Sequence, residues 1–186
     1  MFPGVIWRVS KRLFVALELP LPTRERLAGL DPQVRGVRWM TAEQTHLTIS
    51  FLGEVEADAE ERLHDALAKV RVGSFFLPLT GVGVFGGERP TVVWAGVGKG
   101  HPHLFALHKR IQDEVLRAGL EPDLRPFHPH VTLGRARNVS RHDLKAFLRK
   151  FEQTEFDLVH VTGFTLFSSV LACEGASHTV ELRVEF

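Results

Sequence analysis

The sequence has no tyrosine and only one cysteine, Cys173, among its 186 residues. One thiol cannot form a disulfide within the chain, and so few cysteines are typical of proteins from a reducing compartment. The sequence therefore predicts a cytoplasmic protein whose stability comes from the burial of apolar side chains.

Long hydrophobic runs and an excess of charge of one sign are also missing. No stretch reaches the roughly 18 apolar residues of a membrane-spanning helix, and residues 1–10 are too short and mixed for a signal peptide. The 23 basic and 22 acidic side chains leave a net charge of +1, so bulk charge cannot hold nucleic acid or an anionic membrane. We expect no association with a membrane, and any anion site must be local.

Length and hydrophobic periodicity predict a single α+β domain over residues 1–186. The length suits one domain, and a composition of 44% apolar and 24% charged residues is average for a folded chain. Alternating or β-branched segments predict strands, and apolar residues three or four apart predict helices. The expected strands are residues 12–19, 45–53, 75–85, 91–97, 130–133, 156–170 and 179–186. The expected helices are residues 23–30, 57–70, 104–116 and 140–151, the last opened by a capping box of Ser140 and Asp143.

A short motif with the pattern His-x-Thr occurs twice. Residues 46–49 read His-Leu-Thr-Ile and residues 130–133 read His-Val-Thr-Leu, each on a predicted strand. Side chains two apart on a strand point to the same face, so each copy places a histidine beside a threonine with apolar residues behind. In the first copy the alternation continues, which predicts a polar face of His46, Thr48 and Ser50. The repeat predicts two related halves that face each other.

Two such pairs suit the cleavage of a phosphodiester. One imidazole can take a proton from the nucleophile while the other gives a proton to the leaving oxygen, because the imidazole pKa lies near neutrality. The hydroxyls of Thr48 and Thr132, with a nearby arginine, can donate to the oxygens on which negative charge develops. This scheme needs no metal ion. A single His-x-Thr on a strand is common, so the prediction depends on the presence of two copies. The residues alone do not show which histidine is the acid and which is the base.

These residues resemble the two-histidine phosphoesterase superfamily, and within it the bacterial and archaeal RNA 2′,3′-cyclic phosphodiesterases, which are also called 2′-5′ RNA ligases. The resemblance covers most of the chain. It rests on residues 12–16 (RLFVA), 38–39 (RW), 46–53 (HLTISFLG), 127–135 (FHPHVTLGR) and 166–171, followed by Gly175.

The resemblance implies two pseudo-symmetric lobes, each an antiparallel sheet backed by helices, around a central cleft. It implies that His46 is the proton donor to the leaving 3′ oxygen and that His130 is the proton acceptor that activates water, so that the product carries a 2′-phosphate. Thr48 and Thr132 would bind the non-bridging phosphate oxygens, with help from Arg135. No metal and no other cofactor is expected.

The expected partner is RNA with a 2′,3′-cyclic phosphate end, bound by a monomer that needs no other protein. Three alternatives stay open: 2′-5′ RNA ligation in the same site, hydrolysis of small cyclic nucleotides, and non-catalytic binding of RNA ends. Phe51 and Trp39 are candidates for stacking on a base. The family often has a tyrosine where this chain has His178, so the substrate preference is expected to differ if that position contacts the nucleotide.

Overall fold

The structure of the protein, a computed structural model, describes residues 10–98, 101–172 and 175–186. Cys173 and residues 1–9, on which the expectations of a reduced thiol and of no signal peptide rest, lie outside these ranges. The strands in the described part are β1 (Ser10–Glu18), β2 (Val37–Trp39), β3 (His46–Glu56), β4 (Phe75–Phe85), β5 (Val92–Val97), β6 (His130–Ala136), β7 (Glu155–Val161), β8 (Gly163–Ala172) and β9 (Gly175–Glu185). The helices there are α1 (Leu21–Ala28), α2 (Ala57–Leu67), α3 (Pro102–Arg117), α4 (Lys145–Phe151) and the 3-10 helix η1 (Ala42–Gln44). None of these helices is long and apolar enough to cross a membrane.

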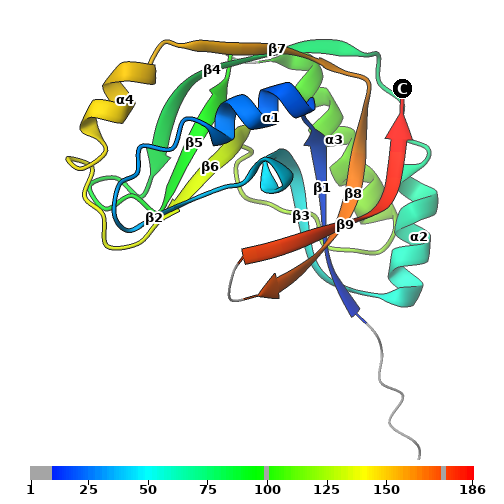
Figure 1. Ribbon diagram of the computed structural model, residues 1–186. Coiled ribbons are helices and arrows are strands. Elements are labelled where there is room, and N and C mark those ends of the chain that lie inside the picture. The colour runs from blue at the N-terminus through cyan, green and yellow to red at the C-terminus, as the bar shows by residue number, and fades with distance from the viewer. Residues whose placement is uncertain (1–9, 99–100, 173–174) are drawn as a thin grey trace, which may run out of the picture.

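The strands form one antiparallel sheet that divides into two lobes (Figure 1). The strand order over the described residues is β7-β4-β5-β6-β3-β1-β8-β9, with β2 paired to β6. We call β3-β1-β8-β9 the first lobe and β7-β4-β5-β6 with β2 the second lobe, since they carry the first and second motif. In the described residues a single pair, Leu47 opposite Val131, joins them. The predicted α+β fold with two antiparallel lobes is confirmed.

Each lobe is built from both halves of the chain. β4 follows the first motif in sequence but pairs with β5 and β7, whereas β8, near the C-terminus, pairs with β1. Two helices are exchanged in the same way: α1 follows β1 of the first lobe but contacts β7, and α3 follows β5 of the second lobe but contacts β3. The two lobes therefore do not coincide with the two halves of the sequence, although each lobe carries one motif.

The apolar stripes predicted from periodicity meet in one core. In α3 the buried stripe is Leu104, Leu107, Ile111 and Val115, as the spacing predicts. The same core cluster takes residues from both lobes and from α1, α2 and α4. The helices therefore fix the two lobes against each other by shared burial of apolar side chains.

Two expectations about local structure are wrong. Residues 156–170 form two strands and not one, because the chain leaves the second lobe after Val161, passes Thr162 and enters the first lobe at Gly163. Ser140 and Asp143 do exchange hydrogen bonds, with the Ser140 amide 2.9 Å from Asp143 Oδ2, but α4 begins only at Lys145 because turns follow the box. The short elements β2 and η1 were not expected, since three residues are too few to show a period.

We predict that Leu47→Ala lowers the free energy of unfolding by about 2–5 kcal/mol, because the side chain is fully buried at the junction of the lobes. Chemical denaturation of the variant measures this loss. Leu124→Ala is the control, since Leu124 is 90% exposed and its removal leaves no cavity. Equal stability of the two variants would contradict the role of the junction.

Candidate active site

The junction of the lobes brings the two motifs together. Leu47 and Val131 are opposite each other in antiparallel strands, so the register places His46 across from Thr132 and Thr48 across from His130. The two paired residues point into the core, and their four neighbours therefore share the other face. The structure thus places all four predicted motif side chains on one surface.

A β-bulge changes which residues accompany His46 and Thr48. Opposite β1, Thr48 pairs with Ala16 and Ser50 pairs with Val15, so Ile49 is an extra residue in β3. The alternation shifts by one, and Phe51 joins the face of the histidine. Ser50 is 2% exposed, with Oγ 3.3 Å from Oε1 of Gln112 on α3. The predicted polar face of His46, Thr48 and Ser50 is therefore wrong at Ser50.

A second bulge at the equivalent place positions Arg135. Opposite β5, Thr132 pairs with Trp94 and Gly134 pairs with Val93, which leaves Leu133 as the extra residue. Arg135 therefore lies on the face of Thr132, as Phe51 lies on the face of Thr48. Arg38 of β2 is opposite Arg135 and shares this face. Arg135, predicted as a phosphate contact from the resemblance, lies on the surface that carries both motifs.

Aromatic rings surround both histidines. The ring of His46 lies 5.0 Å from Phe14 and 5.2 Å from His178, measured between centroids. The ring of His130 lies 4.9 Å from Phe85, edge to face. The rings that the structure adds to the site come from strands other than the motif strands, so the motifs alone could not reveal them. One signal in the sequence could have revealed Phe14. The alternation of β1 places Phe14 on the same face as Ala16, which is paired with Thr48.

Burial lowers the pKa of His46 to about 4. The positive charge of a protonated His178 adds to this effect, and Arg135 and His130 add less. A backbone hydrogen bond to Gln44 acts in the opposite direction. His46 is therefore neutral at pH 7 in the free protein, and it releases a proton readily once it has received one.

His130 is held by a hydrogen bond to the backbone. Its Nδ1 lies 2.6 Å from the carbonyl oxygen of His128, which can only accept, so Nδ1 carries the proton and donates it. Burial lowers the pKa of His130 below its ordinary value of 6.5. The neutral ring therefore has an unprotonated Nε2, which is the state that a proton acceptor needs.

A cavity of about 410 Å³ adjoins both motifs. Its lining includes Thr48 and His130, together with Phe51, Phe85, Phe127 and Arg125. Phe51 is 48% exposed, with the Arg125 guanidinium 6.0 Å from its ring centroid, and it can stack on a planar ligand. Trp39 cannot, because its ring packs edge-on against Phe147 and its Nε1 donates to the Leu27 carbonyl oxygen. Of the two predicted stacking residues, the structure thus supports only Phe51.

Among the residues that the structure describes, no group of three or more His, Cys, Asp or Glu side chains could hold a metal ion. His101 and His103 pack against Phe75, at centroid distances of 5.0 Å and 5.8 Å. The absence of a metal from the reaction stays a prediction.

The sequence and the fold match those of known proteins. The family model of the 2′-5′ RNA ligase superfamily matches residues 20–169. The chain belongs to this superfamily. The RNA 2′,3′-cyclic phosphodiesterase of Aeropyrum pernix is 38% identical to it over 162 residues, which cover 81% of this chain and 89% of the relative. The enzyme of that name from Aquifex aeolicus is 33% identical, with 81% of this chain and 82% of the relative covered.

Solved structures with related sequences have the same fold. Escherichia coli LigT complexed with 3′-AMP superimposes with a TM-score of 0.79 at 31% identity, covering 96% of this chain and 99% of that chain. The protein TT0787 of Thermus thermophilus gives a TM-score of 0.75 at 27% identity, covering 94% and 97%. The resemblance found in the sequence is confirmed.

We predict that an NMR titration of the free protein gives His46 a pKa of about 4, and His130 a pKa below 6.5. In His178→Gln the pKa of His46 rises, because a nearby positive charge is removed. His142→Gln, at an exposed position that makes no contact with the motifs, serves as the control. A pKa of 6.5 or more for His46 in the unmodified protein would contradict the burial described above.

Proposed function

We propose that this protein hydrolyses the 2′,3′-cyclic phosphate at the end of an RNA to a 2′-phosphate. The observation that carries the proposal is the placement of two histidines and two threonines on one face by the Leu47–Val131 pair. The relatives from Aeropyrum pernix and Aquifex aeolicus are named for this activity. The LigT structure with 3′-AMP supports a site that accepts a nucleoside phosphate.

In the proposed reaction the two histidines divide the proton transfers. His130 Nε2 takes a proton from water as the water oxygen bonds to phosphorus. The bond between phosphorus and the 3′ oxygen breaks, and His46 gives its proton to that oxygen. The products are a 3′-hydroxyl and a 2′-phosphate, and each histidine ends in the protonation state in which the other began. Because His46 is neutral at pH 7 in the free protein, this step needs the negative charge of the bound phosphate, which raises the pKa of His46 and favours its protonated form.

The phosphate contacts come from the same face. Within the described residues the hydroxyls of Thr48 and Thr132 donate to no protein group, so both are available to a non-bridging oxygen. Arg135 is near enough to influence the pKa of both histidines and adds a positive charge. Donors fixed in place before the reaction stabilise the charge that develops in the transition state. Phe51 would stack on the terminal base in the adjoining cavity.

We further propose that both lobes act as one domain over residues 1–186, since the face needs a motif from each lobe. A monomer suffices for this arrangement, and neither a cofactor nor a protein partner enters the reaction. The even balance of charge and the scarcity of cysteine support a cytoplasmic enzyme.

We predict that His46→Ala and His130→Ala each lower the turnover of an RNA oligonucleotide with a 2′,3′-cyclic phosphate end by about 10² or more. The assay contains EDTA and separates 2′- from 3′-phosphate products. His160→Ala, an exposed histidine on the edge strand β7 and away from the face, should keep the activity. Binding without turnover in the unmodified protein would favour a binding module instead, and loss of activity in EDTA would favour a metal enzyme.

The pH dependence follows from the two pKa values. The reactive form needs His130 neutral and His46 protonated, so kcat/KM follows a bell whose centre lies between the pKa values of the pair in the free protein. Both are below 6.5, and we therefore predict a maximum of kcat/KM below pH 6.5. The maximum of kcat should lie at higher pH, because the bound phosphate raises both pKa values. A kcat/KM that keeps increasing from pH 6.5 to 8 would contradict this assignment.

A further inference from the structure

The chain carries its charge unevenly in the two segments that follow the motif strands. Residues 135–150, from the end of β6 to α4, contain six Lys or Arg residues and one Asp. Residues 54–65, from the end of β3 into α2, contain six Asp or Glu residues and one Arg. A net charge of +1 for the whole chain therefore conceals two strong local charges of opposite sign.

The six cations form what we call the basic strip. They are Arg135, Arg137, Arg141, Lys145, Arg149 and Lys150, and all six are exposed. In the part of the chain that the structure describes, the ion pairs lie elsewhere, on cations such as Lys11, Arg62 and Arg183. Arg135 lies on the face that carries His46, Thr48, His130 and Thr132, which we call the catalytic face. The strip therefore begins at the proposed site of reaction and continues outward along the second lobe.

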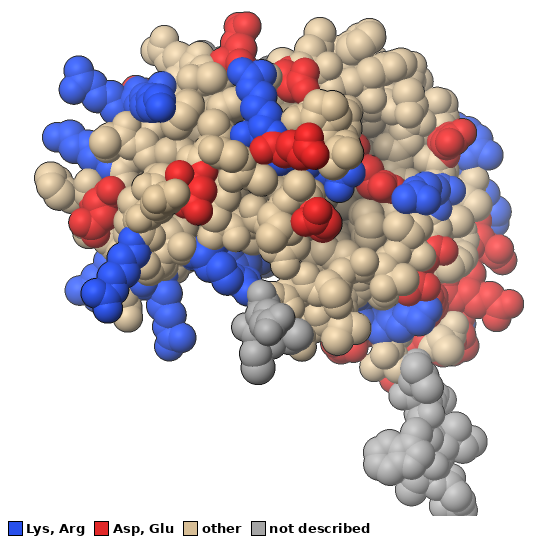
Figure 2. Space-filling view, viewed as in Figure 1, with Lys and Arg blue, Asp and Glu red and all other residues tan. Residues whose placement is uncertain are grey.

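The two charges lie on opposite sides of the molecule. In Figure 2, Lys and Arg gather at the left and lower left, where Figure 1 places β2 and α4. Asp and Glu gather at the lower right, on the side of α2. A polyanion that reaches the catalytic face is therefore attracted by the second lobe and repelled by the first.

We propose that the RNA chain leading to the cyclic phosphate lies along the basic strip of the second lobe. This inference rests on the proposed function, and it adds the direction in which the RNA leaves the site. Phosphate contacts position a nucleic acid without reading its sequence, which exposed Arg and Lys side chains suit. A mononucleotide would reach the catalytic face but not the outer part of the strip.

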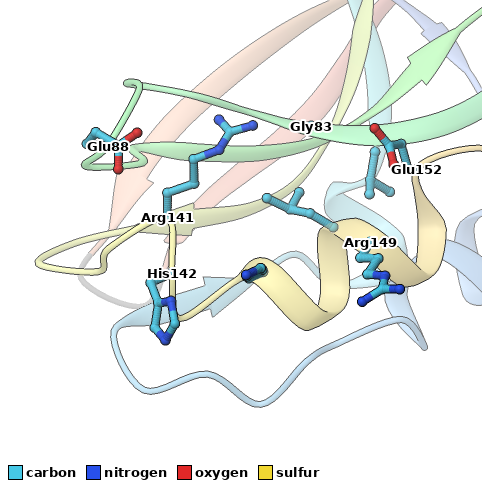
Figure 3. Close-up of a pocket in the computed structure, with 9 residues that line it drawn as sticks. Gly83, Glu88, Arg141, His142, Arg149 and Glu152 are labelled. Carbon is cyan, nitrogen blue, oxygen red and sulfur yellow. The ribbon is translucent and has the colours of Figure 1, made fainter.

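The hollow beside the strip is not where we place the phosphates. It measures about 430 Å³ and lies between α4 and β4, with Glu88 and Glu152 in its wall. Figure 3 shows the guanidinium of Arg141 directed toward β4, whereas the side chains of His142 and Arg149 point away from that strand. Arg141, Lys145 and Arg149 also line the hollow, but Glu88 and Glu152 offset most of their charge there, so we place the phosphates along the exposed outer side of the strip.

The test compares two substrates in a triple variant, Arg141→Ala, Lys145→Ala and Arg149→Ala. The substrates are an RNA of about ten nucleotides and a mononucleotide, both with a 2′,3′-cyclic phosphate. For the oligonucleotide we expect kcat/KM at low salt to fall about tenfold or more, and for the mononucleotide to stay within about twofold. The dependence of log kcat/KM on log salt for the oligonucleotide should become shallower by about 2, at roughly 0.7 for each lost phosphate contact.

The matched control removes three exposed cations from α3, with Lys109→Ala, Arg110→Ala and Arg117→Ala. It changes the net charge equally but lies over the first lobe, so both substrates should be hydrolysed as by the unmodified protein. Equal losses on both substrates in the strip variant, or equal losses in strip and control variants, would overturn the proposal. If the unmodified protein turns over neither substrate, the proposed function itself fails, which is a different result from a strip that has no effect.

Discussion

One backbone pairing organises the active site. Leu47 and Val131 are the point at which the two lobes meet, and both side chains are buried with no exposed surface. Because the strands are antiparallel there, each motif histidine faces the threonine of the other motif. The reaction needs a proton acceptor and a proton donor on one surface, and this pair provides that surface with one group from each lobe. The exchange of strands and helices between the lobes then holds the junction in place, since α1 and α3 each pack against the lobe to which their preceding strand does not belong.

The two β-bulges determine which further side chains lie beside the two motifs. Each motif is followed by one extra residue, Ile49 or Leu133, and the residue three positions after each threonine turns toward the catalytic face. The equivalent positions carry different chemistry, with Phe51 in the first lobe and Arg135 in the second. A stacking ring thus stands beside one motif and a positive charge beside the other. The asymmetry continues outward, because the segment after the first motif is acidic and the segment after the second is basic. A nearly symmetric scaffold thus offers asymmetric surroundings, which suit the proposed substrate with a base at one side and a phosphate chain at the other.

Local patterns in the sequence predicted most of the helices and strands, because burial imposes a period that each element shows by itself. The buried stripe of α3 and the strand at residues 75–85 are examples. The repeated motif likewise predicted His46, Thr48, His130 and Thr132 as a set, and the structure brings them together. What the sequence could not show depends on partner strands. The bulge that takes Ser50 off the face of His46 and Thr48 depends on the register of β3 with β1, and the crossing at Thr162 depends on which lobe each strand joins. The place of His178 against His46 depends in the same way on the pairing of β9 with β8.

The central claim is that His46 protonates the leaving oxygen while His130 activates water. A substrate in which sulfur replaces the 3′ bridging oxygen tests this directly, because a thiolate, with a thiol pKa near about 8.5, leaves without receiving a proton. The measurement is the rate of hydrolysis of this substrate by His46→Ala and by His130→Ala, each relative to the unmodified protein. The account predicts that His46→Ala recovers most of its lost rate and that His130→Ala recovers none. Recovery in His130→Ala alone, or in neither variant, would contradict the assignment.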